Sequence, residues 1–211
     1  MNLGFESDLN LSLRFSFMMK KKGLIFVISG PSGSGKTTLA KKLLADSALK
    51  KKLSRMVSFT TRPRRPGERN RHDYFFLSPA QFFKMRRSKK FLEWTRYLGY
   101  YYATAKDNIE AKINQGRSIV LCVDQKGAFR IKRLFPKSTR LIFILPPNLK
   151  ALEKRINLRS QSKGSEEMLR RLHLAREEMK LRRKYDWRIV NKDLGKALKE
   201  LKAIVKKEIV G

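Results

Sequence analysis

Cysteine is scarce in this chain of 211 residues, which contains a single one, Cys122. A lone cysteine cannot form an internal disulfide and cannot supply the thiolates of a zinc cluster, so neither stabilises the fold. Because proteins without disulfides are typical of reducing compartments, we expect a cytoplasmic protein. The chain also lacks an apolar run of the about 20 residues that span a membrane. Residues 1–19 lack the basic start and apolar centre of a secretory signal.

Acidic residues are few, with 18 Asp and Glu against 50 Lys and Arg, which gives a formal net charge of +32. A cleft for nucleotide phosphates does not need such a surplus. Either the surface binds a polyanion such as nucleic acid or anionic lipid, or lysine merely covers solvated faces. The basic residues are spread along the chain rather than gathered in a tail, which favours solvated faces and leaves nucleic-acid binding open as an additional role.

A complete phosphate-binding motif, GxxxxGK[ST], stands at residues 30–37 as GPSGSGKT. An apolar run at residues 24–29 precedes it and leucines at helical spacing follow it, so the order is strand, glycine-rich loop, helix. Glycine lets backbone N–H groups turn inward around a phosphate, and the helix N-terminus adds partial positive charge. We predict that Lys36 reaches the β- and γ-phosphates of a nucleoside triphosphate and that Thr37 coordinates Mg²⁺. The predicted ATP-binding residues of this loop are Gly30, Pro31, Ser32, Gly33, Ser34, Gly35, Lys36, Thr37 and Thr38.

Arginines gather in a loop at residues 60–68, where two prolines and a glycine break regular structure. Arg62, Arg64 and Arg65 lie there, and the residues 73–77 after the loop alternate like a strand. Because the guanidinium fork matches phosphate oxygens, the loop suggests capture of a second phosphate. Basic loops are more often merely solvated, so the loop by itself leaves both explanations open.

Two further apolar runs, residues 119–124 and 141–145, indicate buried strands with a helix at 125–134 between them. This alternation predicts an α/β fold with a parallel, doubly wound sheet. Ligands of such sheets bind beyond the carboxyl ends of the strands, so we expect Asp124 to face the phosphate loop. Sequence patterns also predict helices at 79–92 and 194–210 and a short strand at 187–190.

Residues 149–184 have a helical, heavily charged pattern with a break near residues 160–165. Arg155 and Arg159 are four residues apart and so share a helix face, and Arg171 follows the break. Arginines on a movable pair of helices could close over a transferred phosphoryl group and neutralise its charge. Taken alone, a solvated helix face explains the pattern equally well.

These pieces occur in one order, and in that order the chain resembles the guanylate kinase family of P-loop nucleoside monophosphate kinases over about residues 23–205. The resemblance rests on GPSGSGKT, SFTTRPRRPGERNRHDYFF, FLEW followed by GYYYAT, the strand end at Asp124 with Gly127, FILPP and VNKD. It implies a P-loop NTPase-like core with a parallel doubly wound sheet, an inserted mixed α/β GMP-binding subdomain and a helical lid. The implied division is a core at 20–56, 108–148 and 181–211, a GMP-binding subdomain at 57–107 and a lid at 149–180; residues 1–19 lie outside the resemblance, and we expect them to be a disordered extension.

The resemblance also implies roles for individual residues. The GMP phosphate would be held by Arg62, Arg65, Tyr74 and Tyr102, and the base by Ser58, Glu93, Thr104 and Asp124. The transferred phosphoryl group would lie among Lys36, Arg155, Arg159 and Arg171, and Asn191 would lie near the adenine of ATP.

Guanine recognition by these residues makes chemical sense. The acceptors O6 and N7 suit hydroxyl donors, and the N–H donors at N1 and N2 suit the carboxylate of Glu93. Adenine would place a ring acceptor opposite Glu93 and leave buried polar groups unpaired. Three positions depart from the family pattern: Cys122 stands where an aspartate is usual, and Arg71 and Ala103 stand where glycine is usual.

The function implied is a guanylate kinase of purine nucleotide metabolism, which transfers the γ-phosphoryl group of ATP to GMP, and also to dGMP. ATP and Mg²⁺ would be its cofactors, and it would act as a monomer or homodimer without a membrane partner. The first alternative is a non-catalytic, guanylate-kinase-like module that binds partners, which would not need to keep Lys36 and Thr37. The second is another small-molecule kinase on the same core, against which Ser58, Glu93 and Thr104 argue.

Overall fold

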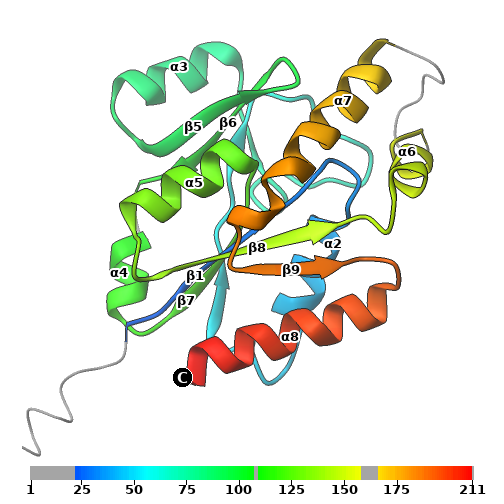
Figure 1. Ribbon diagram of the computed structural model, residues 1–211. Coiled ribbons are helices and arrows are strands. Elements are labelled where there is room, and N and C mark those ends of the chain that lie inside the picture. The colour runs from blue at the N-terminus through cyan, green and yellow to red at the C-terminus, as the bar shows by residue number, and fades with distance from the viewer. Residues whose placement is uncertain (1–21, 107–108, 158–165, 211) are drawn as a thin grey trace, which may run out of the picture.

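The computed structural model describes residues 22–106, 109–157 and 166–210, and it contains two β-sheets (Figure 1). The predicted extension at residues 1–19 lies outside the described residues. None of the helices in the described ranges has the length and apolar character that crossing a membrane would require.

The larger sheet is fully parallel, with strand order β2-β7-β1-β8-β9. Every residue of β1 is buried, as expected for an apolar strand covered on both faces. Because all five strands point the same way, their carboxyl ends share one edge, and the loops there form the site. The strands are β1 (Ile25–Ser29), β2 (Leu53–Arg55), β7 (Ser118–Cys122), β8 (Thr139–Leu145) and β9 (Trp187–Val190).

Helices cover both faces of this sheet, as the doubly wound prediction requires (Figure 1). Alternate side chains of β1 enter different clusters: Phe26 and Ile28 pack toward α2 and α8, whereas Ile25 and Val27 pack toward α4 and α5. The helices are α2 (Lys36–Leu44), α4 (Ile109–Asn114), α5 (Gln125–Leu134) and α8 (Leu194–Val210).

The smaller sheet is mixed, with strand order β4-β3-β6-β5, and helix α3 packs beside it through the fully buried Phe82. A capping box between Ser78 and Gln81 begins α3. The predicted helix at 79–92 is too long: α3 ends at Arg87, Lys89 has a φ of 52°, and β5 begins at Phe91. The elements are β3 (Phe59–Thr60), β4 (Phe75–Phe76), α3 (Pro79–Arg87), β5 (Phe91–Tyr97) and β6 (Tyr100–Ala105).

Two helices, α6 (Leu149–Asn157) and α7 (Glu166–Lys180), follow β8 and are succeeded by the short 3₁₀ helix η1 (Leu181–Lys184). A small separate cluster joins them, made of Leu152 and Ile156 from α6 and Ala175 from α7. The predicted break at 160–165 lies outside the described residues. In Figure 1, α6 stands beyond the edge of the larger sheet where the strand carboxyl ends lie, and α7 runs obliquely from that side back toward the start of β9.

Candidate functional site

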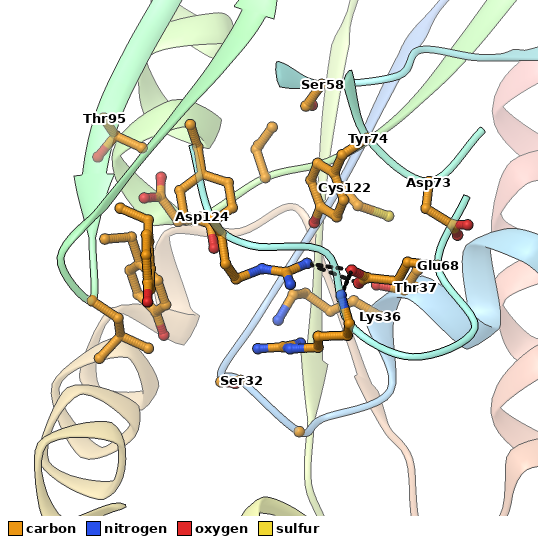
Figure 2. A pocket seen from close by; sticks show the side chains of 18 of the residues that line it. Ser32, Lys36, Thr37, Ser58, Glu68, Asp73, Tyr74, Thr95, Cys122 and Asp124 are labelled. Atoms are coloured by element: carbon orange, nitrogen blue, oxygen red, sulfur yellow. Dashed lines mark hydrogen bonds and ion pairs between the residues drawn. The ribbon is translucent and has the colours of Figure 1, made fainter. Parts of the chain in front are cut away.

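A cavity of about 950 Å³ opens where the glycine-rich loop, the smaller sheet and α7 meet (Figure 2). It contains residues from all three regions of the sequence that were predicted to bind phosphate. Figure 2 shows Thr95 and Asp124 on one side of the pocket and Tyr74, Glu68 and Lys36 on the other. The predicted site residues that line it are Gly30, Ser32, Gly33, Lys36, Thr37, Thr38, Ser58, Arg62, Arg65, Tyr74, Glu93, Tyr102, Asp124 and Arg171.

The glycine-rich loop has the curled backbone that its motif predicts. Gly30, Gly33 and Gly35 all have positive φ, and Gly35 directly precedes α2. The Nζ atom of Lys36 donates hydrogen bonds to the carbonyl oxygens of Gly30 at 2.5 Å and Pro31 at 2.9 Å. The ammonium group is thus folded over the loop, at the place where a bound phosphate would be.

Two predicted residues, Asn191 and Arg155, brace this loop without lining the cavity. Asn191 Nδ2 donates to the Ser34 carbonyl at 2.8 Å, and Arg155 donates to the Asn191 carbonyl at 3.0 Å. A Cβ at Gly35 would come within 2.2 Å of Asn191 Nδ2, so glycine is required there for this contact. Asn191 and Arg155 therefore connect the loop to β9 and α6. The remaining predicted arginine, Arg159, lies outside the described residues.

The four side chains predicted for the GMP phosphate converge on one part of the cavity. The rings of Tyr74 and Tyr102 have centroids 6.1 Å apart, and the guanidinium carbon of Arg62 lies 5.6 Å from the Tyr74 centroid. Burial lowers the pKa of Arg65, and the nearby charges of Arg62 and Arg171 lower it further. Three guanidinium groups close enough to oppose one another form a strongly positive subsite, which favours an anion.

Glu68, which was not predicted, holds the arginine loop in shape. Arg62 donates to both of its carboxylate oxygens, at 2.8 and 2.9 Å, and the backbone N–H of Arg65 donates to Oε2 at 2.9 Å. The Arg62 side chain is only 8% exposed, so Glu68 neutralises a charge that water cannot reach well. Its signal in the sequence is the acid that follows the Pro-Gly turn, at the end of the arginine run.

Removing the charge of Glu68 should therefore destabilise the protein. We expect Glu68→Gln to lower the free energy of unfolding by about 1–3 kcal/mol, because a buried guanidinium loses its ionic partner. Saturating GMP should reduce this loss, since the phosphate supplies a substitute anion. Thermal unfolding with and without GMP measures both effects, and the exposed Glu153→Gln serves as the control. Equal unfolding temperatures for Glu68→Gln and the wild type would contradict this account.

A second region of the cavity presents carboxylates instead of arginines. The hydroxyl of Thr104 donates a hydrogen bond to Glu93 Oε1 at 2.6 Å, and this bond holds the carboxylate in position. Thr104 itself is fully buried and acts on the cavity only through Glu93. Burial raises the pKa of Glu93 to about 7, the Thr104 hydrogen bond opposes this rise, and the charge of Asp124 adds to it. Ser58 is buried and also lines the cavity.

Asp124 lies two residues after the end of β7 and caps α5. Its Oδ1 accepts a hydrogen bond from the backbone N–H of Gly127 at 2.8 Å. A Cβ at Gly127 would come within 3.1 Å of Glu93 Oε2, so the glycine lets the two carboxylates approach the same space. Burial also raises the pKa of Asp124. The two acids therefore form a region that favours hydrogen-bond donors.

Cys122 lines the cavity but cannot replace the charge of an aspartate. Burial raises the pKa of its thiol to about 11, so it stays protonated near neutral pH.

Asp73, another carboxylate that lines the cavity, connects the arginine loop to α2. It pairs with Lys41 of α2 at 2.5 Å and accepts a hydrogen bond from the backbone N–H of Arg69 at 2.9 Å. Although burial acts to raise the pKa of Asp73, these bonds hold it well below its usual range. Asp73 thus fastens the arginine loop to α2.

Thr95, Tyr97 and Glu178 are among the other lining residues that were not predicted. A signal for the first two was present, because Glu93, Thr95 and Tyr97 alternate along β5 and so share one face. Glu178 follows Arg171 by seven residues, or about two helical turns, which places both on the same side of α7.

Arg71 is one of the three positions that depart from the family pattern, which has glycine there. Its φ is 63°, a backbone conformation that favours glycine.

Comparison with known proteins agrees with this geometry. The family model described as Guanylate kinase matches residues 22–208. The chain belongs to the guanylate kinase family. It is 44% identical over 185 residues to a guanylate kinase of Methylococcus capsulatus, covering 87% of this chain and 88% of that one. It is 39% identical over 190 residues to a guanylate kinase of Wolbachia pipientis wMel, covering 90% and 92%.

A solved structure supports the same assignment. The crystal structure of guanylate kinase from Anaplasma phagocytophilum matches with a TM-score of 0.77 and 29% identity, over 92% of this chain and 90% of that one. The predicted family and the predicted fold class, an α/β fold of the P-loop NTPase type with a parallel sheet and a second mixed sheet, are confirmed. The division into core, GMP-binding subdomain and lid stays a prediction.

Proposed function

We propose that this protein is an ATP:GMP phosphotransferase, a nucleoside monophosphate kinase that makes ADP and GDP from ATP and GMP. One observation supports this most directly: a single cavity holds the glycine-rich loop with Lys36 on one side and a subsite of Arg62, Arg65, Tyr74 and Tyr102 on another. Two anion sites within one cavity suit a donor triphosphate and an acceptor monophosphate. GMP and ATP are the small-molecule substrates of the family.

The chemistry requires positioning and charge neutralisation rather than a covalent intermediate. Backbone N–H groups of the loop and Lys36 would hold the β- and γ-phosphates. Arg171, on the same cavity, would neutralise charge on the transferred group, with Arg155 and Arg159 as the other lid arginines in this role. The donor-favouring region at Glu93 and Asp124 suits the N–H edge of guanine, with Ser58 facing its acceptors.

Thr37 is the residue that would hold Mg²⁺. Its hydroxyl lies in the first turn of α2 beside Lys36 and lines the cavity, and Mg²⁺ prefers such oxygen ligands together with phosphates and water. The part of the chain that the structure describes has no cluster of three His, Cys, Asp or Glu side chains that could cage a metal ion, which fits an ion that arrives with the nucleotide. When bound, the ion neutralises charge on the phosphates.

The decisive experiment is an ADP-release assay with ATP·Mg²⁺ and each of GMP, dGMP, AMP, CMP and UMP. We expect turnover with GMP and dGMP and little with the other three. Turnover with none of them would favour the non-catalytic module, which the intact Lys36 and Thr37 disfavour. Preferred turnover of AMP, CMP or UMP would favour a different kinase. A cytoplasmic location and a monomeric or homodimeric state complete the proposal.

The pH dependence tests the role of Glu93. Its pKa is raised to about 7, chiefly by burial, so at pH 6 the carboxyl is mostly protonated and accepts N–H bonds poorly. We expect kcat/KM for GMP to rise with pH through about 7, where Glu93 is half ionised, and to level off above about pH 8. The substrate phosphate titrates near pH 6 as well, so the measured quantity is the ratio of wild type to Glu93→Gln, in which that titration cancels. A ratio constant from pH 6 to pH 8 would remove this role.

A further inference from the structure

Glu178 is a buried carboxyl group that the proposed chemistry leaves unused. It is 6% exposed, it lines the cavity from α7, and its Oε2 atom is buried without a hydrogen-bond partner. An ionisable group in such a place costs free energy unless something pairs with it. Because Glu178 lines the cavity, a hydrogen-bond donor that binds there lies beside this residue.

Helix α7 holds Glu178 near the donor-favouring region formed by Glu93 and Asp124. Its backbone carbonyl accepts a hydrogen bond from Gln125 Nε2 at 2.7 Å, and Gln125 is the residue directly after Asp124. Arg171, two turns earlier on α7, lines the same cavity. A contact made by Glu178 would therefore fix the helix that carries one of the proposed catalytic arginines.

The charges around Glu178 also favour a donor. Burial raises the pKa of Glu178 to about 7 and the charge of Asp124 adds to the rise, whereas the charge of Lys36 and a hydrogen bond with Tyr97 oppose it. The charge of Asp124 thus opposes the ionisation of Glu178. Tyr97 on β5 faces the same two acids, which, after burial, raise the pKa of its hydroxyl. A neutral group with two N–H bonds between Asp124 and Glu178 would satisfy both carboxylates.

Guanine has such a group. Its N–H edge offers one hydrogen at N1 and two on the 2-amino group, and the side of the cavity away from the arginine loop offers three carboxylates to accept them, Glu93, Asp124 and Glu178. We infer that Glu178 is a third guanine-recognition residue, which accepts one hydrogen of the 2-amino group and thereby draws α7 and Arg171 onto the bound nucleotide. This inference rests on the proposed function and extends it. The same contact that recognises the base would also bring Arg171 to the bound nucleotide.

Inosine monophosphate provides the test, because its base has the N1 hydrogen but no 2-amino group. We expect Glu178→Met to weaken GMP binding by about 10- to 50-fold, as for loss of a charge-assisted hydrogen bond. Inosine monophosphate binding should change less than threefold. Glu178→Gln, which keeps a neutral acceptor, should restore part of the GMP affinity. The neighbouring exposed Glu177→Met is the matched control and should bind both nucleotides like the wild type.

Calorimetric titration gives the affinities, and small-angle scattering gives the compaction on adding GMP, which we expect in wild type and Glu177→Met but not in Glu178→Met. Equal losses for the two nucleotides, or none for either, would overturn the inference. Glu178→Met should unfold near the wild-type temperature, because the lost interaction with Tyr97 is offset by the removal of a buried ionisable group. A failure of the proposed function would look different, since the wild type itself would then not phosphorylate GMP.

Discussion

Lys36→Met is expected to lower turnover of ATP and GMP by about 10³-fold while leaving the protein folded. The Lys36 ammonium is the charged group of the glycine-rich loop, and in this structure it donates to the carbonyl oxygens of Gly30 and Pro31 at 2.5 and 2.9 Å. A triphosphate in the loop offers it stronger, anionic acceptors, and these gain charge as the phosphoryl group leaves. Removing one preorganised donor from such a position costs about 10²- to 10³-fold in rate.

Folding should survive this substitution because the loop has other supports. The positive φ values of its glycines and the hydrogen bond from Asn191 to the Ser34 carbonyl do not involve the lysine. The ADP-release assay measures turnover, and thermal unfolding checks the fold. Lys42→Met, an exposed lysine on the same helix, is the control and should remain fully active. Turnover of Lys36→Met within tenfold of wild type, with the fold intact, would contradict the assigned role.

Much of the core was predictable because its local signals agree with its tertiary environment. The phosphate loop, the strand over 187–190 and the helices over 125–134 and 194–210 occur as predicted. Apolar runs specify buried parallel strands, and helical spacing specifies the helices that cover them. The edge strand β2 (Leu53–Arg55) was missed, because a three-residue strand with one buried side chain carries little pattern.

The site was predictable where a residue contributes its own chemistry, and less so where it acts through a neighbour. Arginines beside a proline-rich loop suggest phosphate binding directly. Glu68 has only a weak signal in the sequence, its place after the Pro-Gly turn, since its importance comes from the buried guanidinium of Arg62 that it neutralises. Glu178 does not stand out, because one acid among the charges of α7 gains meaning only when burial is known.

Arg155 and Asn191 show a second limit of prediction from the sequence, because their contacts with the loop could not be foreseen. The resemblance placed them near the transferred phosphoryl group and the adenine, and the structure finds them bonded to each other and to the loop. Their contacts support the phosphate loop from outside the cavity. A role toward ATP stays a prediction for both, and their bracing of the loop is an additional function that spacing along the chain could not indicate.

Glu93→Gln is expected to lower kcat/KM for GMP by about 10²-fold and to leave the slow reaction with AMP nearly unchanged. The Thr104 hydroxyl donates to Oε1 of Glu93, which leaves Oε2 for the guanine edge. In glutamine the amide NH₂ must face either the Thr104 hydroxyl or the N–H groups of guanine, so a charge-assisted bond is lost in both orientations. Adenine has a ring acceptor at this position, which an amide NH₂ can satisfy.

The selectivity between the two nucleotides is the quantity to measure, because it separates recognition from folding. Rates with GMP and AMP are compared in wild type, Glu93→Gln and the exposed control Glu200→Gln on α8. A misfolded variant would lose both activities together, whereas loss of base recognition lowers the ratio of GMP to AMP alone. Since Glu93 contacts Thr104 and lies beside Gly127, its orientation is fixed before the nucleotide arrives. An equal fall in the rates with GMP and with AMP would mean that this carboxylate supports the fold and that other residues recognise guanine.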